Sequence, residues 1–252
     1  MNQKLSRKRI KALDEFLGSI NLEKDLLKKI TQQKFLHHDT VNEALTHSSA
    51  NKKENYEKLE FLGDAVLRLV ASEFIERNFP GMKVGDRSAL RSQLVSDKWL
   101  TKAGQEIGIQ NVIEIGPKTL GDDAAKATIQ AEATEALIGA LYESSRELEA
   151  IHNWLLPFWV KETKAVLADP HKNNYKSALQ EWSQGKGFTL PNYTTQEKCK
   201  KHGNAKRFFC TVDIKGKLIS EGWGSSIKEA EKDAAQNALN ILEDTNLNFD
   251  TK

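Results

Sequence analysis

The sequence has few cysteines, no long apolar run and no apolar core near its start. Its two cysteines, Cys199 and Cys210, cannot form a disulfide framework, which favours a reducing compartment. No apolar run approaches the roughly 18–20 residues that cross a bilayer, so a membrane protein is excluded. Charged residues such as Asp14 and Glu15 stand where a secretion signal needs apolar ones. We therefore expect no cleaved signal and a cytoplasmic location.

The chain also has little net charge, +2 from 37 basic and 35 acidic residues, and 39% of its 252 residues are hydrophobic. This composition excludes disorder as the main state. The total hides a split, because residues 171–240 carry twelve Lys and Arg against seven Asp and Glu, while the remainder carries 25 against 28. The polar stretch around Pro170 predicts the joint. The predicted parts are a domain at 1–168, a linker at 169–173, a domain at 174–244 and a flexible tail at 245–252.

Apolar spacing predicts a different architecture for each segment. The first segment has apolar residues at spacings of three and four, which predicts helices at Leu13–Ile30, Tyr56–Phe79, Ser88–Ile107, Ala124–Ser145 and Leu148–Leu167. The second segment predicts a helix, three strands and a helix, at Lys176–Gly185, Tyr193–Lys200, Arg207–Ile214, Leu218–Trp223 and Ile227–Leu242. We expect an all-α domain followed by a small α+β domain of order α-β-β-β-α.

The predicted helix Tyr56–Phe79 contains the run EKLEFLGDAVL, whose acidic residues share a face. At about 100° per residue, Glu57, Glu60 and Asp64 fall within about 60° of one another, beside an apolar face. Like charges at these spacings repel and cost a helix a few tenths of a kcal/mol per pair. A bound cation would reverse the sign of that interaction.

The predicted helix Ala124–Ser145 repeats this arrangement in IQAEATEALIGALY. Glu132 and Glu135 share a face with small residues that would let another helix approach closely. Two such helices could place four carboxylates around one point, those of Glu60, Asp64, Glu132 and Glu135. Oxygen-only ligands suit hard cations such as Mg²⁺ or Mn²⁺, which activate water and stabilise charge on a phosphate.

Two alternatives to a Mg²⁺ or Mn²⁺ site have to be considered for these acidic residues. An acidic helix face is most often solvated, and for any one pair taken alone this stays the simpler interpretation. A di-iron bundle is the nearest chemical competitor, but it would need a Glu-x-x-His pair on two helices. Gly63 and Glu135 stand three residues beyond Glu60 and Glu132, which disfavours that competitor.

Several motifs together resemble the ribonuclease III family. EKLEFLGDAVL is similar to the family signature, whose usual form is close to ERLEFLGDSVL, and IQAEATEALIGALY is similar to the family's second carboxylate helix. ALTHSSA at Ala44–Ala50 resembles the motif that precedes the signature. YKSALQEW, NAKRFFCTV and EGWGSSIKEAEKDAAQNAL are similar to a double-stranded RNA-binding domain. The resemblance covers nearly the whole chain in the bacterial domain order.

The resemblance implies an endonuclease domain that forms a homodimer and cuts both strands of an RNA duplex. The ends would carry a 5′-phosphate and a 3′-hydroxyl, with a short 3′ overhang. Asp64 and Glu135 would be catalytic within a Mg²⁺ cluster of Glu60, Asp64, Glu132 and Glu135, for which Mn²⁺ could substitute. Glu57 would lie near the RNA. Phe61 would insert into the partner subunit, although a place in the core of its own subunit is the alternative.

The resemblance also implies an RNA-binding surface on the second domain. Its expected residues are Lys176, Gln180, Glu181, His202, Asn204, Ser226, Lys228 and Lys232. Such a domain recognises duplex shape through 2′-hydroxyls and phosphates, so its affinity falls with salt. A protein-interaction module is the alternative for this domain.

The chain departs from the family pattern at four positions. Glu132 stands where the family commonly has Asp, which shifts the carboxylate by about one methylene at a metal whose geometry is strict. Asn204 occupies the usual histidine position, and Ile227 and Glu231 replace frequent lysines. We therefore expect weak RNA binding, for which Lys198, Lys200 and Lys201 are candidates to compensate. His47 is interpreted as structural or as an RNA contact.

The leading hypothesis is thus a metal-dependent endoribonuclease that processes ribosomal, messenger and other structured precursor RNAs, without an organic cofactor or a membrane partner. A non-catalytic double-stranded RNA-binding protein that keeps the fold is the alternative from another class. A third hypothesis is a helical structural or regulatory protein whose acids are solvated.

Overall fold

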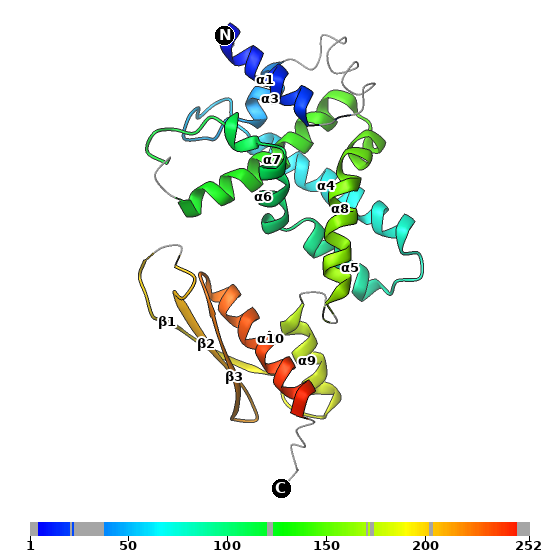
Figure 1. Cartoon of the computed structure of the whole chain (residues 1–252), viewed down its shortest axis with the longest axis vertical. Coiled ribbons are helices and arrows are strands. Elements are labelled where there is room, and N and C mark those ends of the chain that lie inside the picture. The colour runs from blue at the N-terminus through cyan, green and yellow to red at the C-terminus, as the bar shows by residue number, and fades with distance from the viewer. Residues whose placement is uncertain are drawn as a thin grey trace. The chain divides into compact units, whose positions relative to one another are not determined.

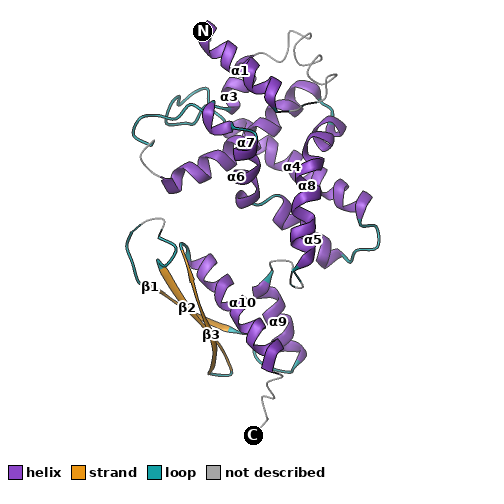
Figure 2. Ribbon diagram, in the orientation of Figure 1, coloured by secondary structure: helices purple, strands orange, loops and turns teal. Residues whose placement is uncertain are grey.

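The computed structural model describes residues 5–20, 22, 38–119, 123–169, 171, 174–201 and 204–245. The chain divides into two compact units, Met1–Val166 and Leu167–Lys252 (Figure 1). Figure 2 shows that the first unit is built from helices and that the second combines helices with a sheet. The expected fold class is confirmed. None of the helices described is long and apolar enough to cross a membrane.

The first unit contains α1 (Arg7–Ser19), α3 (His38–Ala44), α4 (Glu57–Asn78), α5 (Val84–Leu94), α6 (Asp97–Glu106), the short 3-10 helix η1 (Ile109–Asn111), α7 (Asp123–Ser145) and α8 (Leu148–Ala168). The single helix predicted at Ser88–Ile107 is wrong, because α5 and α6 share that range. Ser96 separates them, since its hydroxyl accepts a hydrogen bond from the backbone N–H of Trp99 at 3.2 Å and begins α6. Of the helix predicted at Leu13–Ile30, residues 21 and 23–30 lie outside the described residues.

Helices α4 and α7 pack with their backbones in contact. A Cβ atom at Gly63 would overlap the backbone carbonyl of Glu135, and one at Gly139 would overlap the carbonyl of Leu59. The small residues seen in the sequence therefore allow the close approach that was predicted. Because the acidic positions lie beside these contacts, the packing brings the acids of both helices together.

An aromatic cluster fixes α8 against the rest of the first unit. The rings of Phe74 and Trp159 have centroids 5.3 Å apart, and Trp99 stacks on Trp159 at 6.0 Å. The buried indole N–H of Trp159 donates to the carbonyl of Leu94 at 3.2 Å, where α5 ends. This hydrogen bond satisfies a polar group inside an apolar core and holds the α5 to α6 break in place.

The second unit contains α9 (Tyr175–Gly185), β1 (Asn192–Glu197), β2 (Phe208–Ile214), β3 (Lys217–Gly224) and α10 (Ile227–Thr245). The strands form an antiparallel sheet in the order β1-β2-β3. Helix α10 packs on β2, β3 and α9, so the helices cover one face of the sheet. Cys210, Val212 and Ile214 alternate into this core, and the hydroxyl of Ser220 donates to the carbonyl of Ala234 at 2.6 Å. Among the described residues of this unit, no helix packs on the other face of the sheet.

Candidate active site and RNA-binding surface

The acids of α4 and α7 line one pocket of about 380 Å³. It is formed by Glu57, Glu60, Phe61, Asp64, Arg68, Val95, Asp97 and Glu135. Glu60 and Asp64 come from adjacent turns of α4, and Glu135 comes from the part of α7 that touches Gly63. Three of the four predicted cluster members are therefore brought together, while Glu132 does not line the pocket.

Like charges crowd this pocket. Burial raises the pKa of Glu135 to about 8, with the charges of Asp64, Glu60 and Asp97 acting in the same direction and Arg68 opposing them. The pKa of Glu60 is also raised, by burial first and then by the charges of Glu132, Glu57 and Asp64. A cation placed among these carboxylates would relieve their mutual repulsion.

Two of the acids already have partners. The Nε atom of Arg68 donates to both carboxylate oxygens of Asp64, at 2.7 and 2.8 Å. The buried phenol of Tyr56, the residue just before α4, donates a hydrogen bond to Oε2 of Glu132. Among the residues that the structure describes, no three Asp, Glu, His or Cys side chains stand ready to hold a metal ion. In the free protein, Asp64 is therefore engaged by Arg68, and Glu132 is engaged by Tyr56.

The pocket nevertheless fits a divalent cation by its donor chemistry. Its ligand atoms are carboxylate oxygens, which hard cations prefer, and its charge is only partly neutralised, by Arg68. The side chain of Arg68 is 58% exposed, so it can swing into solvent and release Asp64. Tyr56 donates to Oε2 of Glu132, which leaves the Oε1 atom of the same carboxylate for a metal ion.

Sequence reasoning missed three polar residues of this site. Arg68 stands four residues after Asp64, a spacing that pairs opposite charges on a helix and could have revealed it. Asp97 follows the N-cap Ser96, and a capping signal there would have exposed the break between α5 and α6. Tyr56 has no local signal, because its partner Glu132 lies on another helix.

Three further predicted residues, Phe61, Glu57 and His47, lie near the carboxylate pocket or in the loop before α4. Phe61 points away from the core and is 84% exposed, beside the acidic pocket, so the core alternative is wrong for this residue. Glu57 is exposed at the rim of the same pocket. His47 is held inside its own loop, since its Nδ1 accepts from the backbone N–H of Ser49 at 3.0 Å and its ring packs edge-on against Tyr56 at 5.5 Å.

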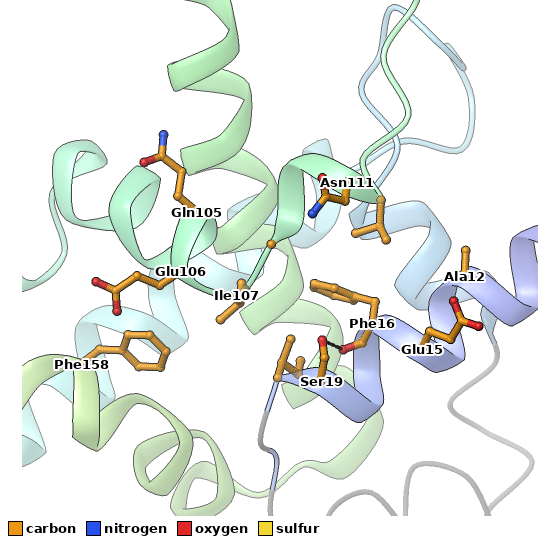
Figure 3. Close-up of a pocket in the computed structure, with 12 residues that line it drawn as sticks. Ala12, Glu15, Phe16, Ser19, Gln105, Glu106, Ile107, Asn111 and Phe158 are labelled. Carbon is orange, nitrogen blue, oxygen red and sulfur yellow. Dashed lines mark hydrogen bonds between the residues drawn. The ribbon is translucent and has the colours of Figure 1, made fainter.

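A larger cavity of about 770 Å³ lies between α1 and the segment from α6 to η1. Figure 3 shows Glu106 and Phe158 on one side of this cavity, and Phe16 and Glu15 on the other. Glu106 is paired with Lys161 at 2.9 Å. The cavity therefore lacks the convergent charges that distinguish the carboxylate pocket.

The predicted RNA-binding residues of the second unit lie on α9, on the β1–β2 connection and at the start of α10. Gln180, Glu181, Ser226 and Lys228 are exposed. The hydroxyl of Ser226 accepts from the backbone N–H of Glu229 at 3.2 Å. His202 lies outside the described residues.

Two of the predicted lysines sit against the helices. Lys176 is paired with Glu231 at 2.6 Å, so the acid at a position where lysine was expected also engages one of the predicted RNA-binding lysines. Lys232 lies over the ring of Tyr175 at 5.6 Å. The side chain of Asn204 accepts from the backbone N–H of Lys206 at 2.8 Å and so shapes its loop.

Comparison with known proteins assigns both units. The family described as Ribonuclease-III-like matches residues 37–155, and the double-stranded RNA binding motif matches residues 175–242. Ribonuclease 3 of Prochlorococcus marinus is 54% identical over 238 residues, which are 94% of this chain and 96% of that protein. The chain belongs to the ribonuclease III family.

A further curated relative agrees with this assignment. Ribonuclease 3 2 of Synechocystis sp. is 38% identical over 79% of this chain and 81% of that protein. Among solved structures, the nuclease domain of ribonuclease III from Campylobacter jejuni matches with a TM-score of 0.48 and 32% identity, covering 54% of this chain and 96% of that chain. This ribonuclease III family member is an endoribonuclease of double-stranded RNA, as the leading hypothesis stated, and its family implies a divalent metal ion.

Proposed function

We propose that this chain cleaves double-stranded RNA by hydrolysis at the carboxylate pocket, with Mg²⁺ as its metal and Mn²⁺ as a substitute. The observation that carries the proposal is the convergence of Glu60, Asp64 and Glu135 in one pocket where burial and like charge raise the pKa of Glu60 and Glu135. Bound there, the metal would supply an activated water and stabilise charge on the phosphate. The ends formed are a 5′-phosphate and a 3′-hydroxyl.

The chain's own residues have distinct roles in this proposal. Glu60, Asp64, Glu132 and Glu135 would hold the metal, with Asp64 and Glu135 nearest to the reaction. Tyr56 fixes one oxygen of Glu132. Arg68 pairs with Asp64 in the free protein and would compete with the metal for that carboxylate.

Cleavage of a labelled RNA duplex with and without Mg²⁺ tests the proposal. Wild-type protein is expected to cleave only with the metal, and Glu135→Ala is expected to lose nearly all cleavage while keeping RNA binding. Glu143→Gln is a matched control, because Glu143 is an exposed acid of the same helix that pairs with Arg146 at 2.7 Å. Binding without cleavage in both Mg²⁺ and Mn²⁺ would favour the non-catalytic alternative. Cleavage by Glu135→Ala at the wild-type rate would contradict the proposed site.

The second unit is proposed to grip the duplex through Lys176, Gln180, Glu181, His202, Asn204, Ser226, Lys228 and Lys232, with ribosomal and other structured precursor RNAs as substrates. In the register of the sheet, Phe208 faces Gly224, so the β1–β2 connection and the start of α10 lie at the same end. Lys228→Ala should therefore weaken duplex binding and reduce its dependence on salt. Lys215→Ala, in the hairpin at the opposite end, should change neither. Equal losses for both variants would contradict this surface.

The catalytic unit is proposed to act as a homodimer through Phe61. A phenylalanine that is 84% exposed beside an active-site pocket leaves a large apolar surface in water. Burying it in a second copy of the chain would remove that cost.

A further inference from the structure

The exposed face of the second unit's sheet carries two aromatic side chains in direct cross-strand contact. Phe209 on β2 and Trp223 on β3 are partners in the register, and their ring centroids lie 4.7 Å apart with a 50° angle between the planes. Trp223 is 38% exposed, and Phe209 is half-buried. Their neighbour Cys210 is buried in the core on the opposite face, where the backbone at Gly222 lies against α10. The two rings therefore lie on the face of the sheet that is turned away from this core.

Two lysines lie over these rings. The Nζ atom of Lys198 is 5.5 Å from the centroid of Phe209, and that of Lys206 is 6.0 Å from the centroid of Trp223. Both lysines are exposed, and Lys198 also donates to the side-chain amide of Gln196 at 2.7 Å. An exposed acid, Glu221, stands two residues before Trp223 on the same face. The aromatic pair thus has cations above both rings and an acid toward the middle of the sheet.

Flat rings flanked by lysines have the chemistry of a nucleotide-binding platform. Bases stack on aromatic faces without sequence preference, and the neighbouring phosphates are attracted by the lysines. A stable protein interface buries about 800 Å² on each partner around an apolar centre. Here the apolar area is confined to one aromatic pair, which Thr194, Gln196 and Thr211 surround with polar groups. The chemistry of this face therefore favours single-stranded nucleic acid over a protein.

The position of the pair suggests which nucleotides it meets. Phe209 and Trp223 lie next to Phe208 and Gly224, the residue pair at the end of the sheet where β3 runs on toward α10. Duplex contacts are proposed at that same end, on the face covered by the helices. We propose that Phe209, Trp223, Lys198 and Lys206 form a platform that binds unpaired nucleotides adjoining the RNA duplex. This platform is separate from the carboxylate pocket and does not depend on the metal.

Binding measurements on the full chain in EDTA test the platform without cleavage. Fluorescence anisotropy would compare a blunt RNA duplex of about 20 base pairs with the same duplex carrying about six unpaired uridines at one 3′ end. Wild-type protein should bind the extended duplex at least about fivefold more tightly, the effect of stacking one base. Trp223→Leu, which keeps apolar bulk but removes the flat ring, should abolish this advantage and leave blunt-duplex affinity unchanged.

Two further variants sharpen the comparison. Trp223→Tyr should keep most of the advantage, because it restores an aromatic face. Leu218→Ala should keep all of it, because Leu218 is a 56% exposed apolar residue of the same strand away from the rings. Equal binding of both RNAs by wild-type protein would overturn the proposal, and so would an advantage that survives in Trp223→Leu.

Crosslinking of wild-type protein gives a readout that needs no variant to fold. With 4-thiouridine in the extension, peptide mapping should place adducts on the segments that contain Phe209 and Trp223. Adducts found only on other segments would overturn the proposal. Failure of cleavage in Mg²⁺ would count against the carboxylate site alone, since neither binding experiment contains the metal.

Discussion

The phenol of Tyr56 donates a hydrogen bond to Oε2 of Glu132 and so connects the first residue before α4 to the carboxylate helix α7. The side chain of Glu132 is one methylene longer than that of the Asp that the resemblance in the sequence leads us to expect at this position. Tyr56 is 2% exposed, so its ring is fixed by packing and gives the longer side chain a defined partner. We therefore interpret Tyr56 as a positioning residue for Glu132.

Tyr56→Phe is expected to weaken metal binding, because Glu132 loses the hydrogen bond that orients its carboxylate. Residues that orient metal ligands typically contribute 10- to 100-fold to metal affinity or activity, so we expect about a tenfold higher Mg²⁺ concentration for half-maximal cleavage. Mn²⁺ binding to the RNA-free protein, followed by electron paramagnetic resonance, should weaken in parallel. In a Glu132→Asp background the same substitution should have less effect, because the shorter carboxylate sits farther from the phenol. Unchanged metal binding in Tyr56→Phe would refute this role.

Gly63→Ala is expected to destabilise the first unit. The added Cβ would meet the backbone carbonyl of Glu135, which has no flexible end that can move away. Overpacking of this kind costs about 1–3 kcal/mol in the free energy of unfolding, and a backbone clash belongs at the upper end. Urea unfolding followed by circular dichroism would measure it.

Gly85→Ala is the matched control for that substitution. Gly85 is also helical, in α5, but a Cβ there meets no atom within 4 Å. Removing a glycine from an unstrained helical position should stabilise the protein by about 0.5–1 kcal/mol. If both variants lost the same stability, close packing of α4 on α7 could not be the cause of the Gly63 effect.

The sequence predicted the parts of the site that depend on helical periodicity. Glu57, Glu60 and Asp64 share a face by spacing alone, and the small residues near Glu135 indicated that another helix would pack there. The period continues through Ser88–Ile107, so it hid the break at Ser96, where a side-chain hydrogen bond to the backbone begins a new helix. Asp97 was missed for that reason.

Other parts of the site depend on contacts that no local pattern records. Glu132 and Glu135 look equivalent in the sequence, yet only Glu135 lines the pocket, because Tyr56 engages the other. The aromatic pair on the sheet likewise depends on strand register, since Phe209 and Trp223 are fourteen residues apart in the chain but direct partners in the sheet. Such relationships follow from tertiary structure.

Metal-free protein should lose stability as pH rises from the unfolded-state pKa of Glu135 to its folded-state pKa. The pKa of this residue is raised from its ordinary value of 4.5 to about 8 in the folded protein, by burial first and then by neighbouring acids. Between these values the folded state holds a proton that the unfolded chain releases. The contribution of Glu135 is therefore fully present below about pH 4.5 and is lost as pH rises to about 8.

Urea unfolding in EDTA across this pH range measures the effect. Glu135→Gln, which cannot ionise, should show a flatter profile than wild-type protein, whereas Glu143→Gln should follow the wild-type profile. Mg²⁺ should stabilise wild-type protein more at about pH 8 than at about pH 6, because the cation favours the ionised carboxylates. Parallel profiles for wild type and Glu135→Gln would show that this carboxyl does not carry the pH dependence.

Phe61→Ser is expected to weaken self-association of the catalytic unit. Burying a phenylalanine side chain stabilises by about 1.5–3 kcal/mol, and a two-fold symmetric interface buries it twice, so the dimer dissociation constant should rise by roughly 10² to 10⁴. Sedimentation equilibrium over a range of concentrations measures this directly. Leu190→Ser is a suitable control, because Leu190 is a 56% exposed apolar residue of the second unit, and its loss should leave the dimer intact. A wild-type chain that stays monomeric at high concentration, or a Phe61→Ser dimer as tight as wild type, would exclude this side chain as the dimer contact.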